Sequence, residues 1–267
     1  MSGFSAEWLA LRDPYDARAR SATVRDAVAA AWRDHTSIAV VDLACGAGAS
    51  LRALSPHLPA RQSWRLVDND LGLLARTPAL AEPPRLTVQA RPVDLARDLE
   101  LALDGPLDLI TCSALLDLVS AAWVERLAVE AAARALPVYA ALSYDGRAVL
   151  EPAHAFDAEM VAAVNRHQRR DKGFGPALGP QAAAFALAQF EEVGYTVVHD
   201  CSDWMLGPQD GVIQDAILTG WAGAARELGD VPLEQIAAWF THRREQRAQA
   251  RLQIGHIDFF AAPKGSR

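Results

Sequence analysis

Residues 37–54 read SIAVVDLACGAGASLRAL, and this stretch decides the fold. A short apolar run rich in β-branched residues ends at Asp42, which is typical of a strand buried in a parallel sheet. The glycine-bearing turn at residues 44–48 (ACGAG) follows it and leads into a helical pattern. Because glycine has no Cβ, such a turn lets backbone N–H groups approach a ligand closely. The stretch therefore predicts a strand, a ligand-binding loop and a helix, with a nucleotide-like ligand on the loop.

Strand and helix patterns alternate along most of the chain. Further short apolar strands are expected at residues 64–68, 85–89, 107–112, 138–143, 195–199 and 255–261. Helices are expected at residues 23–33, 121–136, 156–168, 181–193, 211–228 and 233–252. This alternation predicts an α/β fold with a mostly parallel sheet that is covered on both faces. Ligands of such sheets bind outside the carboxyl ends of the strands.

We expect one domain built on a seven-stranded, Rossmann-like sheet. Residues 1–36 would form an N-terminal lid segment, and residues 37–150 the cofactor-binding core. Helical cap insertions are expected at residues 151–180 and 208–250, and the C-terminal part of the sheet at residues 181–207 and 251–267.

Composition excludes several classes of protein. The 267 residues are 51% hydrophobic and 22% charged, as in ordinary globular proteins, and the net charge of −7 disfavours a nucleic-acid binder. No apolar run approaches the ~18 residues of a membrane span, and the N-terminus lacks the pattern of a signal peptide. The three widely spaced cysteines suggest neither a disulfide framework nor a zinc site. A cytoplasmic protein without a metal is therefore expected.

The glycine pattern narrows the class of ligand. A dinucleotide-binding turn would have a third glycine where this chain has Leu51, which weakens the interpretation as a nicotinamide oxidoreductase. A P-loop would continue with Gly-Lys-Ser/Thr, and that motif does not follow the turn.

Four motifs in order resemble those of class I S-adenosylmethionine-dependent methyltransferases. The run DLACGAG at residues 42–48 resembles the family's first motif, with Ala44 in the place of its first glycine. Asp68, twenty residues after Gly48, lies where the family places an acidic residue on the ribose hydroxyls. Asp94 matches the acidic residue near the adenine amino group, and residues 107–113 (LDLITCS) match the strand whose end lines the methionine part of the cofactor.

The resemblance covers residues 37–143, and more loosely residues 255–261, and implies S-adenosylmethionine as the cofactor. This ligand has no phosphates, so neither a third glycine nor a P-loop lysine is needed. One carboxylate can accept hydrogen bonds from both ribose hydroxyls, and a second suits the adenine amino group. The candidate cofactor-binding residues are Asp42, Ala44, Gly46, Gly48, Asp68, Asn69, Asp94, Leu95, Cys112 and Ser113.

The N-terminal residues 8–20 mix aromatic side chains with three arginines. We expect this segment to cover the cofactor, with Arg12 or Arg20 pairing a carboxylate of cofactor or substrate, because arginine suits bidentate contacts. An amphipathic helix with a solvated face is the alternative.

The expected activity is methyl transfer to a small-molecule acceptor, with Asp117, Tyr144, His154 and His167 as candidate bases. One alternative is an RNA or protein methyltransferase that docks through the arginine clusters at residues 166–172 and 243–251. Another is a non-catalytic domain that binds the cofactor or a partner. The sequence does not indicate the acceptor atom or the oligomeric state.

Overall fold

The computed structural model describes residues 5–265 and is built on one eight-stranded sheet. The strand order is β3-β2-β1-β4-β5-β8-β6, and β7 pairs with β8 beside this path. The strands are β1 (Ser37–Leu43), β2 (Arg61–Asp68), β3 (Leu86–Pro92), β4 (Leu109–Ser113), β5 (Val138–Glu151), β6 (Tyr195–Cys201), β7 (Trp204–Leu206) and β8 (Arg251–Pro263). Strands β1 to β5 pair in parallel, whereas β8 runs antiparallel to β5, β6 and β7. The predicted mostly parallel α/β sheet is confirmed, and β7 is an additional strand that the sequence analysis does not predict.

Helices surround this sheet. The α-helices are α1 (Ala6–Ala19), α2 (Ala22–Ala31), α3 (Ala49–Leu54), α4 (Leu71–Leu74), α5 (Leu99–Ala102), α6 (Ala121–Ala133), α7 (Asp157–Gln168), α8 (Ala182–Glu192), α9 (Gly211–Leu228) and α10 (Leu233–Glu245). Short 3-10 helices are η1 (Ser55–His57), η2 (Thr77–Leu80), η3 (Leu116–Leu118), η4 (Gly179–Gln181) and η5 (Pro208–Asp210). Among residues 5–265, no helix is long and apolar enough to cross a membrane.

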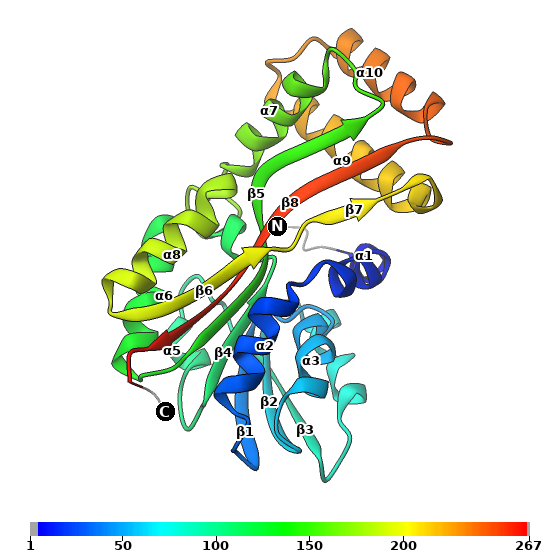
Figure 1. Ribbon diagram of the computed structural model, residues 1–267. Helices are drawn as coiled ribbons and strands as arrows, with labels where there is room; N and C mark the ends of the chain where they lie inside the picture. The colour runs from blue at the N-terminus through cyan, green and yellow to red at the C-terminus, as the bar shows by residue number, and fades with distance from the viewer. Residues whose placement is uncertain (1–4, 266–267) are drawn as a thin grey trace.

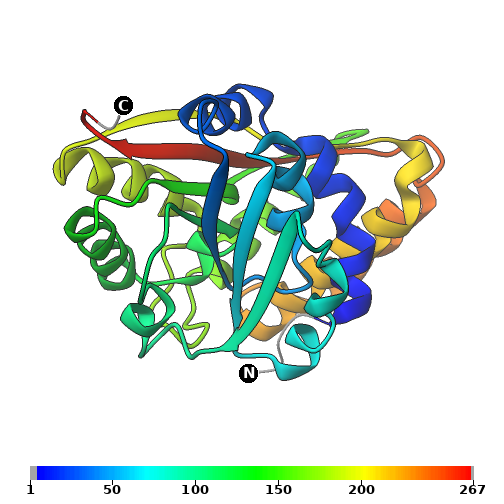
Figure 2. The same cartoon turned by 90° about the horizontal axis from the view of Figure 1, so that it is seen from below.

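Side chains on the two faces of β1 pack into two different hydrophobic cores. Val41 and Leu43 pack with α6 and α8 on one face of the sheet, while Ile38 and Val40 pack with α2 and α3 on the other. Helices are visible on both sides of the strands in the view from below (Figure 2). Because both faces are covered, apolar residues can follow one another along a strand, as they do from Ile38 to Val41 of β1.

The outer halves of β5 and β8 extend beyond the parallel strands and carry a separate helical layer. Residues 148–151 of β5 pair with residues 251–254 of β8, and β7 pairs with the same part of β8. Helices α7, α9 and α10 pack against this extension around a third core (Figure 1). We call this part the upper unit. It contains most of the predicted cap, together with sheet strands that the sequence analysis does not predict there.

The largest differences from the predicted element boundaries lie at the ends of β5 and α10. Strand β5 continues to Glu151 rather than ending at residue 143, with two register shifts along its pairing with β8. Helix α10 ends at Glu245 rather than at residue 252, because residues 251 and 252 already belong to β8. The first four residues of the predicted lid segment and the last two of segment 251–267 lie outside the described residues.

Candidate functional site

The glycine turn follows β1 as a tightly constrained loop. Ala44, Gly46 and Gly48 all have positive φ angles, of 52°, 52° and 82°. The N–H of Cys45 donates to the carbonyl of Val67 at 2.9 Å, which fixes the loop to the end of β2. A Cβ added at Gly48 would lie 2.4 Å from Leu80 Cδ1, so both the backbone angle and the available space require glycine there.

Asp68 lies beside this loop at the end of β2. Its Oδ2 accepts from the N–H of Gly46 at 2.8 Å, and its Oδ1 accepts from the N–H of Asp70 at 3.0 Å. A carboxylate has about four acceptor positions, so two stay available for a ligand. The side chain is only partly buried, and the predicted pairing of glycine loop and Asp68 is present in space.

Asp42 is fully buried near the end of β1. Its Oδ1 accepts from the Thr111 hydroxyl at 2.8 Å, but its Oδ2 has no hydrogen-bond partner within the described part of the chain. Burial raises the pKa of this carboxyl to about 6, against the opposing effects of Thr111, Ser50 and Arg20. An orphaned buried acceptor normally has a reason, and a place reserved for a ligand's donor is one such reason.

Arg20 projects from the junction between α1 and α2 into the centre of the site. Its guanidinium donates to the Ser113 hydroxyl at 3.0 Å, at the end of β4, and to the Tyr139 hydroxyl at 3.3 Å. Although burial works against the charge, Tyr139 and Asp258 outweigh it and raise the Arg20 pKa. Arg20 thus places a permanent positive charge beside the ends of the central strands.

The remaining predicted cofactor residues lie in different settings. Asp94 is exposed and accepts from the N–H of Ala96 at 3.0 Å, as expected of a residue that caps a turn. Asn69 is exposed, whereas the side chains of Leu95 and Cys112 are buried in the core under α6. Leu95 and Cys112 could therefore reach a ligand mainly through their backbones.

Two of the four candidate bases lie together above β4 and β5. Asp117, in η3, is nine-tenths buried, and its Oδ1 has no hydrogen-bond partner among the described residues. Burial raises its pKa to about 6. The neighbouring Tyr144 hydroxyl donates to Asn165 Oδ1 at 2.7 Å, and burial raises its pKa further above the ordinary value. Tyr144 is therefore engaged in anchoring α7 to β5.

The two histidine candidates lie farther out. His154 Nδ1 accepts from the N–H of Phe156 at 3.1 Å, and its ring packs 4.6 Å from the ring of His242 in the upper unit. His167 Nε2 lies 2.9 Å from Glu227 Oε2 at the surface, and its Nδ1 is 3.5 Å from Lys172 Nζ. Both rings have structural partners, and neither is brought to the ends of the strands with Asp117.

Sequence reasoning missed two buried polar residues of β8. His256 is nine-tenths buried, and its Nδ1 has no partner in the described chain. Asp258 is fully buried and accepts from the backbone N–H groups of Leu142 at 2.7 Å and Ser21 at 3.0 Å. The sequence does carry a signal, because a histidine and an aspartate interrupt the otherwise apolar strand GHIDFFA and such residues are rarely buried without a role.

Comparisons with known proteins match this arrangement at the level of the fold. No protein-family model and no curated protein matches the chain. Among solved structures, a cyclopropane-fatty-acyl-phospholipid synthase-like protein from Lactobacillus casei ATCC 334 aligns with a TM-score of 0.54 at 13% identity, covering 97% of this chain and 94% of that one. The cyclopropane synthase MmaA2 from Mycobacterium tuberculosis aligns with a TM-score of 0.52 at 12% identity over the same shares. A candidate methyltransferase (BH2331) from Bacillus halodurans C-125 gives 0.51 at 14% identity, covering 90% and 97%.

The chain has the class I methyltransferase fold. In this fold, β8 takes the antiparallel position between β5 and β6. The ends of β1, β2 and β4 bring the glycine loop, Asp68 and Ser113 to one edge of the sheet.

Helix α1 covers this edge of the methyltransferase fold. A Cβ added at Gly46 would lie 3.3 Å from Leu9 Cδ1, and Asp13 forms an ion pair with Arg52 of α3 at 2.6 Å. Trp8, Leu11 and Tyr15 pack against the core of the upper unit. The predicted N-terminal lid segment thus lies over the loop, as a helix that contacts both halves of the molecule.

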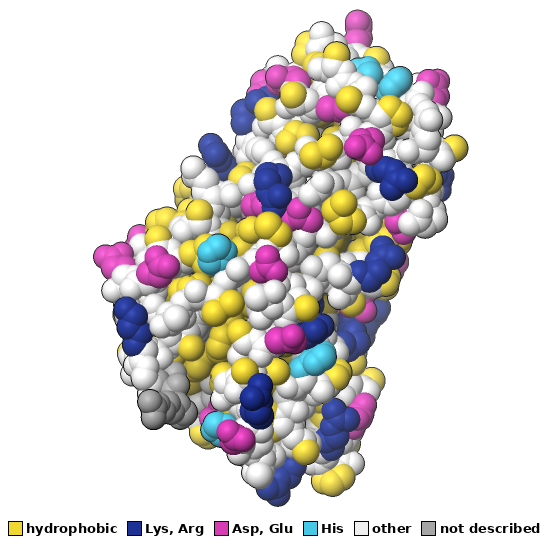
Figure 3. All heavy atoms as spheres, viewed as in Figure 1, with side chains coloured by type: hydrophobic (Ala, Val, Ile, Leu, Met, Phe, Trp, Pro, Cys, Tyr) yellow, Lys and Arg dark blue, Asp and Glu magenta, His cyan; other side chains and the backbone are white. Residues whose placement is uncertain are grey.

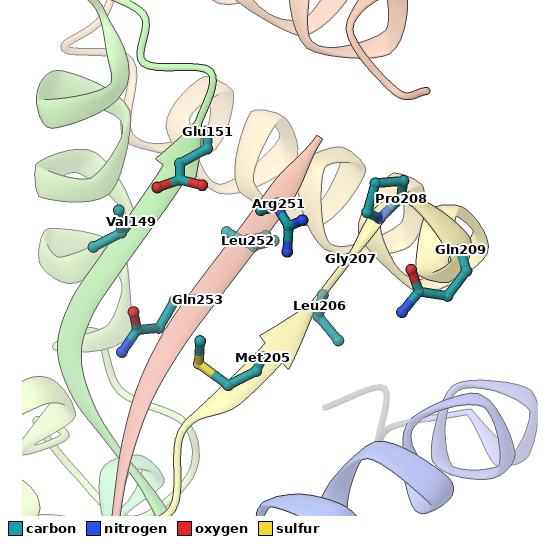
Figure 4. Close-up of a pocket in the computed structure, with 10 residues that line it drawn as sticks. All are labelled: Val149, Glu151, Met205, Leu206, Gly207, Pro208, Gln209, Arg251, Leu252 and Gln253. Atoms are coloured by element: carbon teal, nitrogen blue, oxygen red, sulfur yellow. The ribbon is translucent and has the colours of Figure 1, made fainter. Parts of the chain in front are cut away.

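A separate pocket of about 250 Å³ lies on the open face of the upper unit. Val149, Gln253 and Met205 line it from three adjacent strands (Figure 4). It is remote in sequence from the glycine loop and contains none of the predicted site residues.

Three arginines of the two clusters form ion pairs. Arg166 pairs with Glu159 and Asp230, Arg243 with Asp157, and Arg247 with Asp215. On the face shown in Figure 3, basic and acidic side chains are interspersed rather than gathered by sign. These arginines therefore do not form a free basic surface.

Proposed function

We propose that this protein transfers a methyl group from S-adenosylmethionine to a small-molecule acceptor. The observation that carries the proposal is the grouping of the glycine loop, the partly free carboxylate of Asp68 and the buried charge of Arg20 at one edge of the sheet. The fold agrees with this, since the MmaA2 and BH2331 structures carry names of enzymes that transfer one-carbon groups or methyl groups.

The residues at the loop fit the nucleoside part of the cofactor. Gly46 and Gly48 give the loop its left-handed turns, and the unused acceptor positions of Asp68 suit two ribose hydroxyls. Charge-assisted hydrogen bonds of this kind contribute roughly 1.5–3 kcal/mol each. Asn69, next to Asp68 after β2, would assist at the ribose, and Asp94 and Leu95 would follow the adenine from the end of β3. These assignments remain predictions.

The residues farther along this edge of the sheet fit the methionine part of the cofactor. The guanidinium of Arg20, held beside Ser113, suits the carboxylate of the methionine moiety. The orphaned Oδ2 of Asp42 is an acceptor that suits the amino group. When bound, the cofactor would supply an activated methyl group, and the chain's contribution would be to hold the acceptor in line with it.

A small-molecule acceptor is favoured over RNA or protein. Helix α1 and the upper unit enclose the region above β4 and β5, while Arg166, Arg243 and Arg247 of the two arginine clusters are ion-paired. A methyltransferase acting on RNA should bind RNA with a steep dependence on salt concentration. Absence of RNA binding at low salt would remove that alternative. The cytoplasmic location stays part of the proposal and can be followed with a fluorescent fusion.

Calorimetry with S-adenosylmethionine, S-adenosylhomocysteine and NAD tests the cofactor. We expect the first two to bind and NAD not to bind. Asp68→Ala should weaken binding by at least about tenfold, equivalent to ~1.4 kcal/mol, because it removes the acceptors for the ribose. The exposed residue Asp34 provides the control, and Asp34→Ala should leave the affinity unchanged.

Each failure has a distinct meaning. If neither sulfur compound binds to the folded wild-type protein, the proposal is wrong. If both bind but no acceptor from a cell extract is methylated, the non-catalytic binding domain becomes the better interpretation.

A further inference from the structure

Two buried polar atoms without partners lie on elements that both contact β5. They are Asp117 Oδ1, after β4, and His256 Nδ1, on β8. Each residue is only 6% exposed, so water does not compensate the missing bonds freely. Leaving such an acceptor unsatisfied costs about 1–3 kcal/mol, which makes two of them in one region worth explaining.

Tyr144 connects the two residues. It lies directly opposite His256 in the pairing of β5 with β8, and the two rings are 6.1 Å apart. The backbone of Tyr144 acts on the carboxylate of Asp117 and opposes the effect of burial on its pKa. Trp204 of β7 adds a second aromatic ring, 5.5 Å from that of His256. We call Asp117, Tyr144, Trp204 and His256 the acceptor cluster.

Both unpartnered atoms require hydrogen-bond donors from an occupant. Burial lowers the pKa of His256 to about 3, so its ring is neutral near pH 7, with a proton on one nitrogen and a lone pair on the other; with the proton on Nε2, Nδ1 is the acceptor. The carboxyl of Asp117 is ionised at the same pH and can only accept. An occupant that donates two hydrogen bonds would satisfy the acceptor cluster, whose Tyr144 and Trp204 rings offer apolar walls.

The charges around Asp117 favour a hydroxyl group over an ammonium group in the occupant. Arg12 of α1 acts electrostatically on both Asp117 and His256, and Lys172 acts on Asp117 from the loop after α7. Neither cation lies within ion-pair distance of Asp117 in the described structure. Arg12 is instead held by Asp16 at 2.8 Å and lies 5.2 Å from the ring of Trp204. The positive potential of Arg12 and Lys172 at Asp117 disfavours an ammonium ion there and stabilises an oxygen that is losing its proton.

We propose that the methyl acceptor is a small compound with two neighbouring hydroxyl groups. Asp117 receives the proton of the hydroxyl that is methylated, and His256 Nδ1 accepts a hydrogen bond from the other hydroxyl. This inference rests on the proposed methyltransferase function. In the step, the hydroxyl oxygen forms a bond to the methyl carbon while the carbon–sulfur bond breaks, and that bond's electron pair stays on sulfur. The hydroxyl proton passes to the Asp117 carboxylate and from there to solvent. The products are a methyl ether and the neutral thioether.

A carbon-13 label in the methyl group tests the acceptor atom whatever the substrate is. The protein is incubated with methyl-labelled S-adenosylmethionine and a deproteinised small-molecule extract of the cells that make it. Oxygen-, nitrogen-, sulfur- and carbon-bound methyl groups resonate in separate carbon-13 ranges, and we expect an oxygen-bound signal. A nitrogen-, sulfur- or carbon-bound signal overturns the hydroxyl inference while leaving the methyltransferase function intact. Absence of any labelled product counts against both.

Variants of the two acceptors test their roles. Asp117→Asn should lower the labelled ether at least 100-fold and leave the affinity for S-adenosylhomocysteine within twofold, as removal of a general base typically costs about 10²–10⁴-fold. It should also raise the melting temperature, because it removes an unpaired buried charge. His256→Leu should raise KM more than it lowers kcat, and His256→Gln, which keeps an acceptor, should recover part of the loss.

Asp34→Asn, on the exposed surface, serves as the matched control and should change none of these quantities. Ether formation at the wild-type rate in folded Asp117→Asn would overturn the assignment of the proton acceptor. Equal KM values for His256→Leu and His256→Gln would overturn the role of His256.

Discussion

Ala44 occupies a backbone conformation that glycine adopts more readily. Its φ angle of 52° lies in the left-handed region, at the position where the methyltransferase motif usually has its first glycine. A residue with a Cβ loses roughly 1–2 kcal/mol in this region. The loop tolerates the strain because Cys45 is tied to β2 and Gly46 to Asp68.

Ala44→Gly should therefore stabilise the protein. Relief of strain exceeds the added flexibility of the unfolded chain, so we expect a gain of up to about 1 kcal/mol, or a melting temperature about 2–4 °C higher. Cofactor affinity should stay within twofold of the wild type. Ala47→Gly is the control, because Ala47 has no positive φ and glycine there should destabilise. A lower melting temperature for Ala44→Gly would show that the loop is not strained at this residue.

Asp42 should make stability depend on pH in an unusual direction. Its carboxyl has a folded-state pKa of about 6, above the unfolded value of 3.8, so the folded state binds the proton more tightly. Its contribution to stability is therefore present at pH 4 and is lost as the pH rises through 6, by about 3 kcal/mol in all.

Asp42→Asn removes this titration. The difference in unfolding free energy between the variant and the wild type should be about 2–3 kcal/mol more favourable to the variant at pH 7.5 than at pH 4.5. Urea unfolding at the two pH values measures it, with Asp34→Asn as the exposed control. A difference that does not change with pH would mean that the Asp42 pKa is not raised.

At the scale of elements, the junction between α1 and α2 is fixed to the sheet through β8. Asp258 accepts from the N–H of Ser21, and also from that of Leu142, whose φ of 55° marks the irregularity within β5. Ser21 itself caps α2, since its hydroxyl oxygen accepts from the N–H of Val24. One buried carboxylate thus positions the segment that carries Arg20.

Asp258→Ala should destabilise the protein by about 3 kcal/mol or more, because two buried N–H groups lose their acceptor. It should also weaken cofactor binding, since Arg20 loses its fixed position. Asp200 is the matched control: it lies directly opposite Asp258 in the sheet and accepts from the Ser21 hydroxyl at 2.8 Å, but it is exposed. Asp200→Ala should cost under about 1 kcal/mol. Equal losses for both variants would contradict the central role of Asp258.

The sequence predicts the bounds of an element correctly where the residues at its ends favour a start or a stop. Helix α9 has the predicted bounds, because Gly229 adopts the left-handed conformation that ends helices. The end of α10 carries no such signal: residues 243–252 (RREQRAQARL) are good helix formers, and only pairing with β5 turns the last two into strand. The predicted β5 is too short for the converse reason, since Asp145 and Gly146 resemble a turn in sequence.

The candidate site also contains residues that could be predicted from the sequence and residues that could not. The glycine loop and Asp68 could be predicted because they lie a fixed distance along one strand–loop–helix–strand unit. The position of His256 opposite Tyr144 could not, because it depends on the pairing of β5 with a strand more than 100 residues later. The cofactor roles assigned to single residues remain predictions.

At the scale of the molecule, Arg243 joins the helices of the upper unit. It is buried, forms an ion pair with Asp157 at the start of α7 and donates to the carbonyl of Pro152 at 2.7 Å. Trp239, one turn earlier on α10, donates to the same carboxylate at 2.8 Å.

Arg243→Ala should destabilise the protein by about 3–5 kcal/mol, since it leaves a buried carboxylate without its cation. Arg244→Ala, at the next and exposed position, should change stability by no more than about 0.5 kcal/mol. Denaturant unfolding measures the free energy of unfolding of both variants. The value for Arg243→Lys, which keeps the charge but not the planar guanidinium, should lie between theirs. Similar stabilities for the two alanine variants would place the arginine cluster on the surface after all.

The continuity of β5 and β8 limits how the molecule can open. Both strands run without a break from the parallel sheet into the upper unit, and they are hydrogen-bonded to each other in both parts. Domain hinges are normally a few loop residues that absorb large backbone rotations. Loops do cross this boundary after α7 and between β6 and β7, but β5 and β8 cross it as a continuous pair of strands. A swinging motion of the upper unit would have to bend two paired strands together. Ligands would therefore enter and leave through movement of α1. Within residues 5–265, this helix is attached to the sheet only through the residues around Ser21 and through side-chain contacts.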